Sequence, residues 1–249
     1  MTARIDRIWP DPADSLSDEE IIGALGGGLR SGFGRELRVN FVESIDGAAT
    51  VEGRSGGLSD AADKRRFELL RRVADAVIVG AGTVRAEGYG PLRVSAASAR
   101  WRASHGMTEH PVLVVVSREL ALDPASRIFT EAPVRPILIT GAAVTAASRA
   151  RFDGVADVIA VGRESVDLPA ALAELRGRGL TGLLCEGGPS LFASLLEVDV
   201  VDELCVTIAP RLVAGDAVRI AHGATAPPRD MRLVEVLRSG GALLLRYRR

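Results

Sequence analysis

Two glycine-rich turns each follow a run of apolar residues, and both have residue types that bind phosphate. The first is Gly80-Ala81-Gly82-Thr83, directly after the apolar segment Ala76–Val79. The second is Glu186-Gly187-Gly188-Pro189-Ser190, after an apolar segment that ends at Cys185. Glycines let a backbone approach a phosphate closely, and the N-terminus of a following helix offers free N–H groups with partial positive charge. Either turn alone could be an ordinary connection between strand and helix, but two in one domain could hold the two phosphates of a dinucleotide.

Charged and polar side chains stand at the ends of two predicted strands. Glu186 would project from the carboxyl edge of the sheet, where open α/β sheets bind ligands, although it could instead cap the helix that follows. Ser117 and Arg118 follow the apolar run Val112–Val116. A hydroxyl beside a guanidinium is suited to a phosphomonoester, such as the 2′-phosphate that distinguishes NADPH from NADH. A solvated arginine at a turn is the alternative interpretation.

A third set of polar residues lies near residue 40. Asn40 and Ser44 are an even number of residues apart, so a regular strand would place them on one face, and Asp46 follows in the turn. Asp46-Gly47 is also a common turn sequence with no chemical role. Arg71 lies on a predicted helix, where an arginine is usually solvated.

Strands and helices that alternate along the chain must position these residues. The apolar runs indicate strands buried on both faces, so we predict an α/β fold with a mostly parallel central sheet. Residues 1–36 are expected to form an N-terminal arm with a short helix that Ser17 and Glu20 cap, and residues 37–249 the main domain. Residues 95–109 are predicted to be a polar loop, and Ser59 the cap of a helix. The predicted strands are Leu37–Ser44, Ala76–Val79, Val112–Val116, Ile137–Thr140, 156–161, Leu183–Glu186, Glu203–Ala209, 232–238 and 241–248, the last two forming an antiparallel pair.

Composition limits the class of protein. The chain has 249 residues, 31 basic against 32 acidic, and a net charge of -1, which disfavours nucleic-acid binding. No apolar run reaches the ~18 residues of a membrane span, so we expect a cytoplasmic protein with two buried, reduced thiols at Cys185 and Cys205. The three histidines have no acidic or cysteine partners at metal-binding spacing, so no metal site is expected.

Three segments in this order resemble the reductase domain of the bifunctional riboflavin-biosynthesis deaminase-reductase and its stand-alone relatives. They are Val39–Gly47, Asp75–Arg85 and Leu184–Leu191, the last continuing into Val201–Leu204 and Ala209-Pro210. The resemblance implies a dihydrofolate-reductase-like fold, NADPH as cofactor, a homodimer, and reduction of the ribose of 5-amino-6-(5-phosphoribosylamino)uracil at C1′. The zinc deaminase motifs are absent from this sequence.

The resemblance also implies roles for individual residues. Asp46 and Glu186 are the two candidates for proton handling, between which the sequence does not choose. Substrate contacts are expected at Asn40, Ser44, Ser55, Arg71, Arg93 and Glu186, with Arg71 on the substrate phosphate. Cofactor contacts are expected at Val42, Gly80, Gly82, Thr83, Glu87, Ser117, Arg118, Gly187, Gly188, Pro189, Ser190 and Leu191.

Two departures from the family pattern leave other functions open. The family usually has Asp-Asp-Pro-x-Leu-Thr after the first glycine turn, where this chain has Glu87-Gly88-Tyr89-Gly90-Pro91-Leu92-Arg93, and Gly57 stands where an aromatic residue is often found. One alternative is the same cofactor chemistry on another heterocycle, such as a dihydrofolate-like pterin. Another is a dimer that binds a nucleotide without catalysis.

Overall fold

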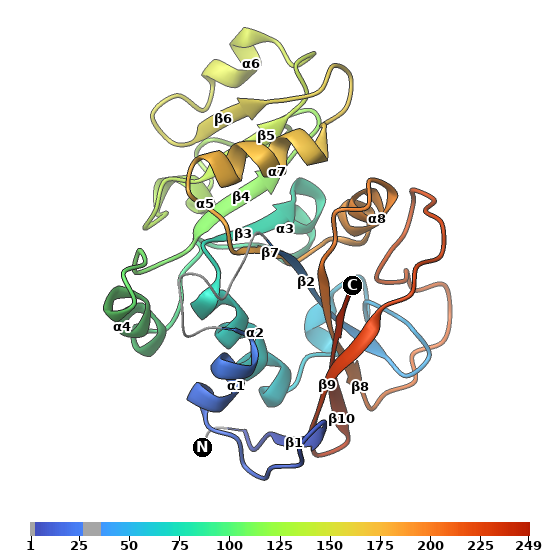
Figure 1. Cartoon of the computed structure of the whole chain (residues 1–249). Helices are drawn as coiled ribbons and strands as arrows, with labels where there is room; N and C mark the ends of the chain where they lie inside the picture. The colour runs from blue at the N-terminus through green and yellow to red at the C-terminus, as the bar shows by residue number, and fades with distance from the viewer. Residues whose placement is uncertain (1–2, 27–35) are drawn as a thin grey trace.

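The computed structural model describes residues 3–26 and 36–249. A ten-stranded sheet runs through the described part of the chain, with helices on both faces (Figure 1). The strand order is β1-β9-β10-β8-β2-β7-β3-β4-β5-β6. The strands are β1 (Asp6–Trp9), β2 (Leu37–Ser44), β3 (Ala76–Gly80), β4 (Val112–Val116), β5 (Ile137–Thr140), β6 (Asp157–Ala160), β7 (Leu183–Cys185), β8 (Glu203–Ala209), β9 (Arg232–Ser239) and β10 (Ala242–Arg248).

The seven strands from β8 to β6 in this order pair in parallel, while β8-β10, β10-β9 and β9-β1 pair antiparallel. This confirms the predicted α/β fold with a mostly parallel sheet and an antiparallel C-terminal pair. The helices are α1 (Asp18–Ala24), α2 (Ala61–Val73), α3 (Ala81–Glu87), α4 (Ala96–Ser104), α5 (Arg127–Thr130), α6 (Ala146–Ala150), α7 (Leu168–Gly177) and α8 (Pro189–Glu197), with a short 3₁₀ turn, η1 (Ser55–Gly57).

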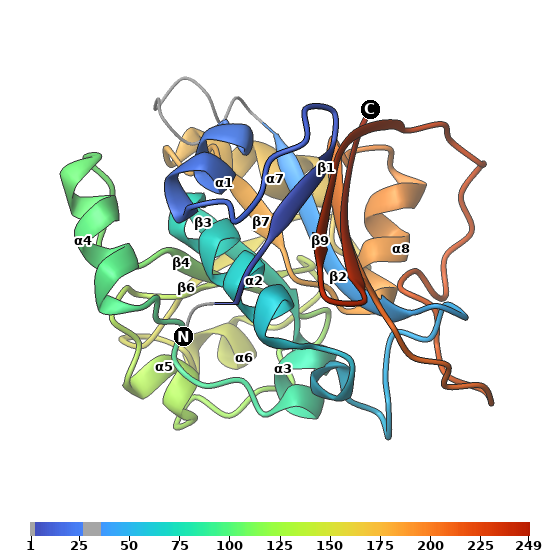
Figure 2. The same ribbon diagram turned by 90° about the horizontal axis from the view of Figure 1, so that it is seen from below.

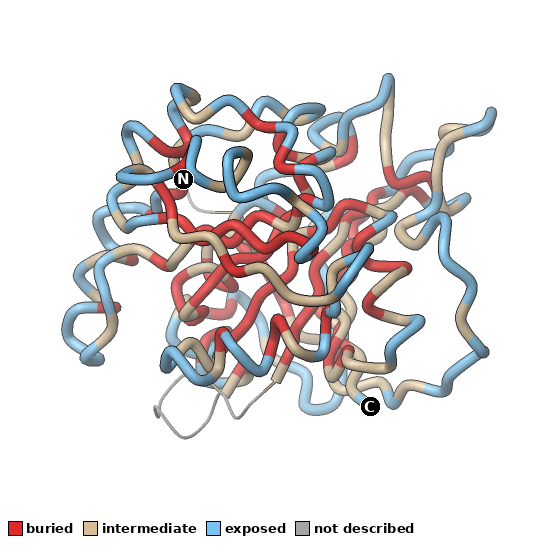
Figure 3. The backbone as a smooth tube through the Cα atoms, turned by 90° about the horizontal axis from the view of Figure 1, so that it is seen from above, coloured by how far each residue is buried: buried red, intermediate tan, exposed pale blue. Residues whose placement is uncertain are grey.

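The two faces of the sheet carry separate apolar cores. One core packs α1, α2 and α5 against side chains such as Val77 and Val115, and the other packs α7 and α8 against Ile78 and Val114. Figure 2 shows α2 and α8 on opposite sides of β2, and Figure 3 shows the buried residues gathered in the middle of the molecule. Successive residues of a strand point to opposite faces, so strands covered on both sides are apolar throughout.

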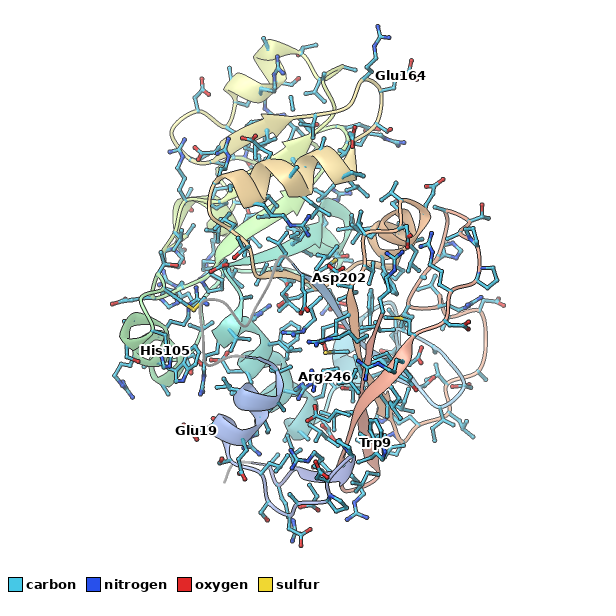
Figure 4. All side chains as sticks on the ribbon, in the orientation of Figure 1. Trp9, Glu19, His105, Glu164, Asp202 and Arg246 are labelled. Atoms are coloured by element: carbon cyan, nitrogen blue, oxygen red, sulfur yellow. The ribbon has the colours of Figure 1, made fainter. Side chains whose placement is uncertain are left out.

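A buried cluster of charges joins α2 to the antiparallel end of the sheet. Glu203 on β8 forms an ion pair with Arg38 on β2. It forms a second one with Arg246 on β10, with 3.5 Å between Glu203 Oε2 and Arg246 Nη1. Glu235 on β9 pairs with Arg246 at 3.4 Å and with Arg66 on α2 at 3.5 Å. Arg246, labelled in Figure 4, is buried. Moving α2 would separate Arg66 from its buried partner and leave a buried charge uncompensated, which is costly. This cluster therefore favours one position of α2 on the sheet.

Some predicted boundaries differ from the structure. Residues 95–109 are not only a loop, because Ser95 caps α4 by accepting from the Ser98 N–H. The cap of α2 is Asp60, one residue after Ser59, because its carboxylate reaches two N–H groups of the first turn. The arm predicted at 1–36 contributes β1 to the edge of the sheet, and its capping box is confirmed. Gly27 and Gly28, at the predicted end of its helix, lie outside the described residues.

Candidate active site

A cavity of about 570 Å³ lies at the carboxyl ends of β2, β7 and β3. Strand order explains the position, since β7 lies between β2 and β3 and brings both glycine turns and the start of α2 to one edge of the sheet. Many of the predicted site residues line it. They are Asn40, Val42, Ser55, Gly80, Gly82, Thr83, Glu87, Glu186, Gly188, Pro189, Ser190 and Leu191.

The two glycine turns contact one another at this cavity. The Gly80 N–H donates to the Gly187 carbonyl at 2.8 Å. Gly187 has a φ of +89°, and a Cβ at this residue would stand 2.8 Å from the ring of Phe41. A Cβ at Gly188 would stand 2.3 Å from the Thr83 hydroxyl. The positive φ of Gly187 favours glycine there, and of these two residues Gly188 lines the cavity.

Helix α8 begins at this point without a side-chain cap. Gly188 is its N-cap and Pro189 its first residue, so no side chain accepts from the free N–H groups of the first turn. Helices α1, α2, α4, α6 and α7, by contrast, have side-chain caps. Free N–H groups at a helix start that faces a cavity are suited to a phosphate.

Glu186 is held by two other residues at the centre of the site. The Arg71 guanidinium donates to both carboxylate oxygens, Nε to Oε1 at 2.6 Å and Nη2 to Oε2 at 2.7 Å. The Tyr89 hydroxyl donates to Oε2 and lies 3.1 Å from Arg71 Nη2. The Glu186 side chain is 2% exposed and that of Arg71 17%. Arg71 also lies over the Phe67 ring, 4.2 Å from its centroid.

This arrangement determines the charge of the group. Burial lowers the pKa of Arg71, but the Glu186 carboxylate outweighs burial and the net effect is a raised pKa. Burial and the same carboxylate raise the pKa of Tyr89 well above its usual value. Arg71 therefore remains a cation and Tyr89 a neutral donor. Arg71, expected on the substrate phosphate, is instead bound to Glu186 and is absent from the cavity lining.

Asp46 lies outside the cavity and anchors a loop. Its carboxylate accepts from the Ser44 hydroxyl at 2.5 Å and from the Val213 and Ala214 N–H groups at 3.2 and 2.7 Å. These hydrogen bonds, that from Ser44 first, lower the pKa of Asp46 to about 2. A general acid near neutral pH requires the opposite shift, so the structure argues against Asp46 as the proton donor. Ser44 shares this structural role, since its hydroxyl also accepts from the Ala48 N–H.

Three of the other predicted residues lie away from the cavity. Ser117 is buried and directly follows β4. Because Gly80 and Val116 are paired in the sheet, Ser117 lies at the same carboxyl edge of the sheet as Gly80. Arg118 is exposed and pairs with Glu119 at 3.4 Å. Arg93 is exposed and donates to the Glu131 carbonyl. Glu87 does line the cavity, and it accepts from the Ser55 N–H at 2.9 Å, which fixes η1 at the rim.

Asp63, Phe67 and Tyr89 line the cavity and were not predicted from the sequence. Asp63, Phe67 and Arg71 are spaced i, i+4 and i+8 on α2, which places them on one face of the helix, and the first two line the cavity. The spacing of an acid, an aromatic ring and a base on one helix face could have indicated, from the sequence alone, that these residues belong to a site. Tyr89 lies in the segment that departs from the family pattern, so no motif indicated its role.

Within the described ranges, no group of three metal-ligating side chains occurs and no helix is long and apolar enough to cross a membrane. His105, at the end of α4, stacks on Trp101 at the periphery (Figure 4). Cys185 and Cys205 are free and buried, as predicted.

Fold and site together define an α/β protein with a ligand cavity at the carboxyl edge of its sheet, and the fold is that of dihydrofolate reductase. The Enterococcus faecalis dihydrofolate reductase superimposes with a TM-score of 0.50 at 13% identity, over 86% of this chain and 96% of that chain. This confirms the fold class expected from the sequence.

Comparison of the whole chain identifies the family. Residues 35–245 match the family described as RibD C-terminal domain, and the chain belongs to this family. A 2,5-diamino-6-ribosylamino-4(3H)-pyrimidinone 5′-phosphate reductase from Methanothermobacter thermautotrophicus is 34% identical over 74% of this chain and 82% of its own. A pyrimidine reductase-like protein from Corynebacterium diphtheriae superimposes with a TM-score of 0.77 at 29% identity, over 86% of this chain and 91% of that one. The resemblance drawn from the three motifs is thereby confirmed.

Proposed function

We propose that this protein is an NADPH-dependent reductase of a phosphorylated ribosylaminopyrimidine of riboflavin biosynthesis, with hydride added to C1′ of the ribose. One observation carries the proposal. One cavity is lined both by the uncapped start of α8 at Gly188, which is suited to a phosphate, and by the Glu186 carboxylate, which Arg71 holds in place. The named relative from Methanothermobacter thermautotrophicus supports the reaction type.

The residues present fit a nicotinamide dinucleotide. The backbone at Gly80 and Gly188 and the Thr83 hydroxyl, all of which line the cavity, would hold the two phosphates. Ser117 and Arg118, beyond the neighbouring strand β4, would contact the 2′-phosphate of the adenosine ribose. When bound, the cofactor supplies the hydride, and the protein contributes binding and orientation.

The chain's own residues would orient the substrate. Glu186, which Arg71 and Tyr89 hold in one rotamer, accepts a hydrogen bond from the ribosylamine and so aligns C1′. Hydride transfer requires the reacting carbons about 3–3.5 Å apart, and such positioning can supply a large part of the rate. In this proposal Arg71 acts through Glu186 and does not bind the phosphate.

We also propose that the protein is a homodimer, as the family resemblance implies. Among the described residues, Leu212 and Ile45 are the most exposed large apolar side chains, at 77% and 62%. The Ile45 N–H donates to the Arg211 carbonyl, so these side chains belong to neighbouring segments. An exposed apolar pair of this kind is suited to contact with a second subunit.

The test measures the oxidation of NADPH by its absorbance, with three substrates in parallel. They are 5-amino-6-(5-phosphoribosylamino)uracil, its 2,5-diaminopyrimidinone counterpart, and dihydrofolate. Turnover of either phosphoribosyl compound supports the proposal, and turnover of dihydrofolate alone favours the pterin alternative. NADPH binding without any turnover would indicate a nucleotide-binding protein. In the same assay, Arg118→Ala should lower the preference for NADPH over NADH about ten- to a hundredfold.

A further inference from the structure

A second cavity, of about 740 Å³, lies between α8, β8 and the segment that joins β8 to β9 (residues 210–231, the β8–β9 segment). It shares no lining residue with the candidate active site, so the two cavities are separate. Figure 1 shows the β8–β9 segment, coloured orange, beside α8. The proposed reaction uses no side chain of this second cavity, although its volume is in the range of roughly 300–1,000 Å³ that is usual for small-molecule sites.

The walls of the second cavity are mainly apolar. Leu196 on α8 and Leu204 on β8 are half-buried there and pack against the core. Ile220 and Met231, from the β8–β9 segment, are half-buried on the same cavity. An open cavity with such walls leaves apolar surface in contact with water. A ligand with an apolar body would remove this surface from water, which favours binding.

Positive charge is in excess in this cavity, since three arginines and two aspartates line it: Arg219, Arg229, Arg249, Asp199 and Asp230. Two of the arginines share one carboxylate, because Arg229 Nη1 lies 3.0 Å from Asp199 Oδ1 and Arg249 Nη2 lies 2.6 Å from Asp199 Oδ2. One carboxylate balances one guanidinium, so this group retains a positive charge. The Arg249 side chain is 53% exposed, so a ligand can reach it. A guanidinium binds carboxylate, sulfonate and phosphate groups through paired N–H donors.

Helix α8 connects the second cavity with the candidate active site. Its first residue, Pro189, lines the active-site cavity, and Leu196, near its end, lines the second cavity. The nine residues of α8 span about 13 Å. The Arg229 guanidinium donates to the Leu196 carbonyl, and the His222 N–H donates to the Pro189 carbonyl at 3.2 Å. The β8–β9 segment is therefore attached to both ends of α8.

The β8–β9 segment also forms part of both cavities. Val218 lines the active-site cavity, and the next residues, Arg219 to Ala221, line the second cavity. The Val218 carbonyl accepts from the N–H of Ala49, another residue of the active-site lining, at 2.9 Å. A ligand that fixes residues 219–221 would therefore also act on one wall of the active site.

We propose that the second cavity binds a small molecule with a flat aromatic body and one anionic group, and that this binding changes the affinity of the active site for the nicotinamide cofactor; the second part rests on the proposed function. The aromatic body would cover the apolar walls and the anionic group would bind Arg249. A small molecule fits this concave site better than a second subunit, which requires a surface of about 800 Å² on each partner. Coupled sites change each other's affinity by the same factor.

The probes are 8-anilinonaphthalene-1-sulfonate, which has an aromatic body and one sulfonate, and its uncharged analogue N-phenyl-1-naphthylamine. Calorimetry measures the binding of each probe with and without saturating NADP⁺, which prevents binding of a probe at the cofactor site. Arg249→Met removes the excess cation, and Ile220→Glu places a carboxylate on the apolar wall. The matched controls, Arg232→Met and Leu243→Glu, make the same kinds of change at exposed residues outside both cavities.

In wild type saturated with NADP⁺, we expect one sulfonate probe per chain with a Kd of about 10–100 µM. The uncharged analogue should bind about tenfold or more weakly, as should the sulfonate to Arg249→Met. Ile220→Glu should not bind the sulfonate, and both controls should bind it as wild type does. The Kd for NADP⁺ should change about fivefold or more when the probe is bound.

Several outcomes would overturn the proposal. They are complete displacement of the sulfonate by NADP⁺, equal affinity for the two probes, wild-type affinity in Arg249→Met and Ile220→Glu, and an unchanged Kd for NADP⁺ with the probe bound. Loss of probe binding as the protein assembles into dimers would show instead that a second subunit covers the cavity. Binding as expected without reduction of any substrate would refute only the proposed function.

Discussion

Removal of Arg71 should destabilise the fold through the charge that it leaves behind on Glu186. The Glu186 side chain is 2% exposed, and it loses two short charge-assisted hydrogen bonds when Arg71 is replaced by methionine. Breaking one partner of a buried pair costs about 3–5 kcal/mol. Because Arg71 is 17% exposed and water can enter the cavity, we expect a loss of about 3 kcal/mol in the free energy of unfolding.

A double-mutant cycle measured by urea denaturation separates this effect from general damage to packing. The double variant Arg71→Met/Glu186→Gln removes both charges, so it should lose about 2 kcal/mol less than the sum of the single variants. Arg178→Met is a matched control, since Arg178 forms an exposed i,i+4 pair with Glu174, and it should lose about 0.5 kcal/mol or less.

The cycle also distinguishes two roles for Arg71. If Arg71 positions Glu186, Arg71→Met should lower kcat together with stability while NADPH affinity is unchanged. If Arg71 instead binds the substrate phosphate, KM should rise, stability should change little, and the two single variants should be additive. Additive losses of stability would therefore refute the reasoning from the Arg71–Glu186 pair.

Two further predictions concern the loop near Asp46 and the state of assembly. The folded pKa of Asp46 is lowered, so its hydrogen bonds contribute stability that is present above its unfolded pKa and is lost as pH falls to about 2. The Tm of wild type should therefore exceed that of Asp46→Asn near neutral pH, and the difference should disappear toward about pH 2; a difference that persists there would contradict the assignment. Sedimentation at micromolar concentration should show a dimer that Leu212→Glu weakens, whereas a wild-type monomer would refute the proposed homodimer.

The fold was largely predictable from the sequence because its signals are local. An apolar run such as Ala76–Val79 is typical of a strand buried on both faces, and a glycine turn directly after it favours a helix that returns over the sheet. The helix that was not predicted also has a local explanation. The helix at Ala96–Ser104 has one large apolar residue, Trp101, and the buried side chain of Arg102 anchors the helix by donating to the Arg72 and Ala74 carbonyls. Neither feature produces a periodic apolar pattern.

The site was predictable only in part. Backbone positions such as Gly188 were identified because a glycine directly after a buried strand indicates a close approach of the backbone to another group. Side-chain roles were harder to predict, because each depends on a partner distant in the chain. Asp46 has the residue type of a general acid, but the Val213 and Ala214 N–H groups make it a loop anchor.

The sequence by itself determined most of the strands and helices, the two glycine turns, and many of the residues that line the cavity at the carboxyl edge of the sheet. Only the tertiary structure decided which of them meet. Arg71 and Glu186 are 115 residues apart, and they pair because β7 lies between β2 and β3 and brings its end beside α2. The same packing buries Asp63 without a cation at the other end of that helix face. Hydrogen bonding and ion pairing depend on distances of a few ångströms. The order of the strands within the sheet sets these distances, and the spacing of residues along the chain does not.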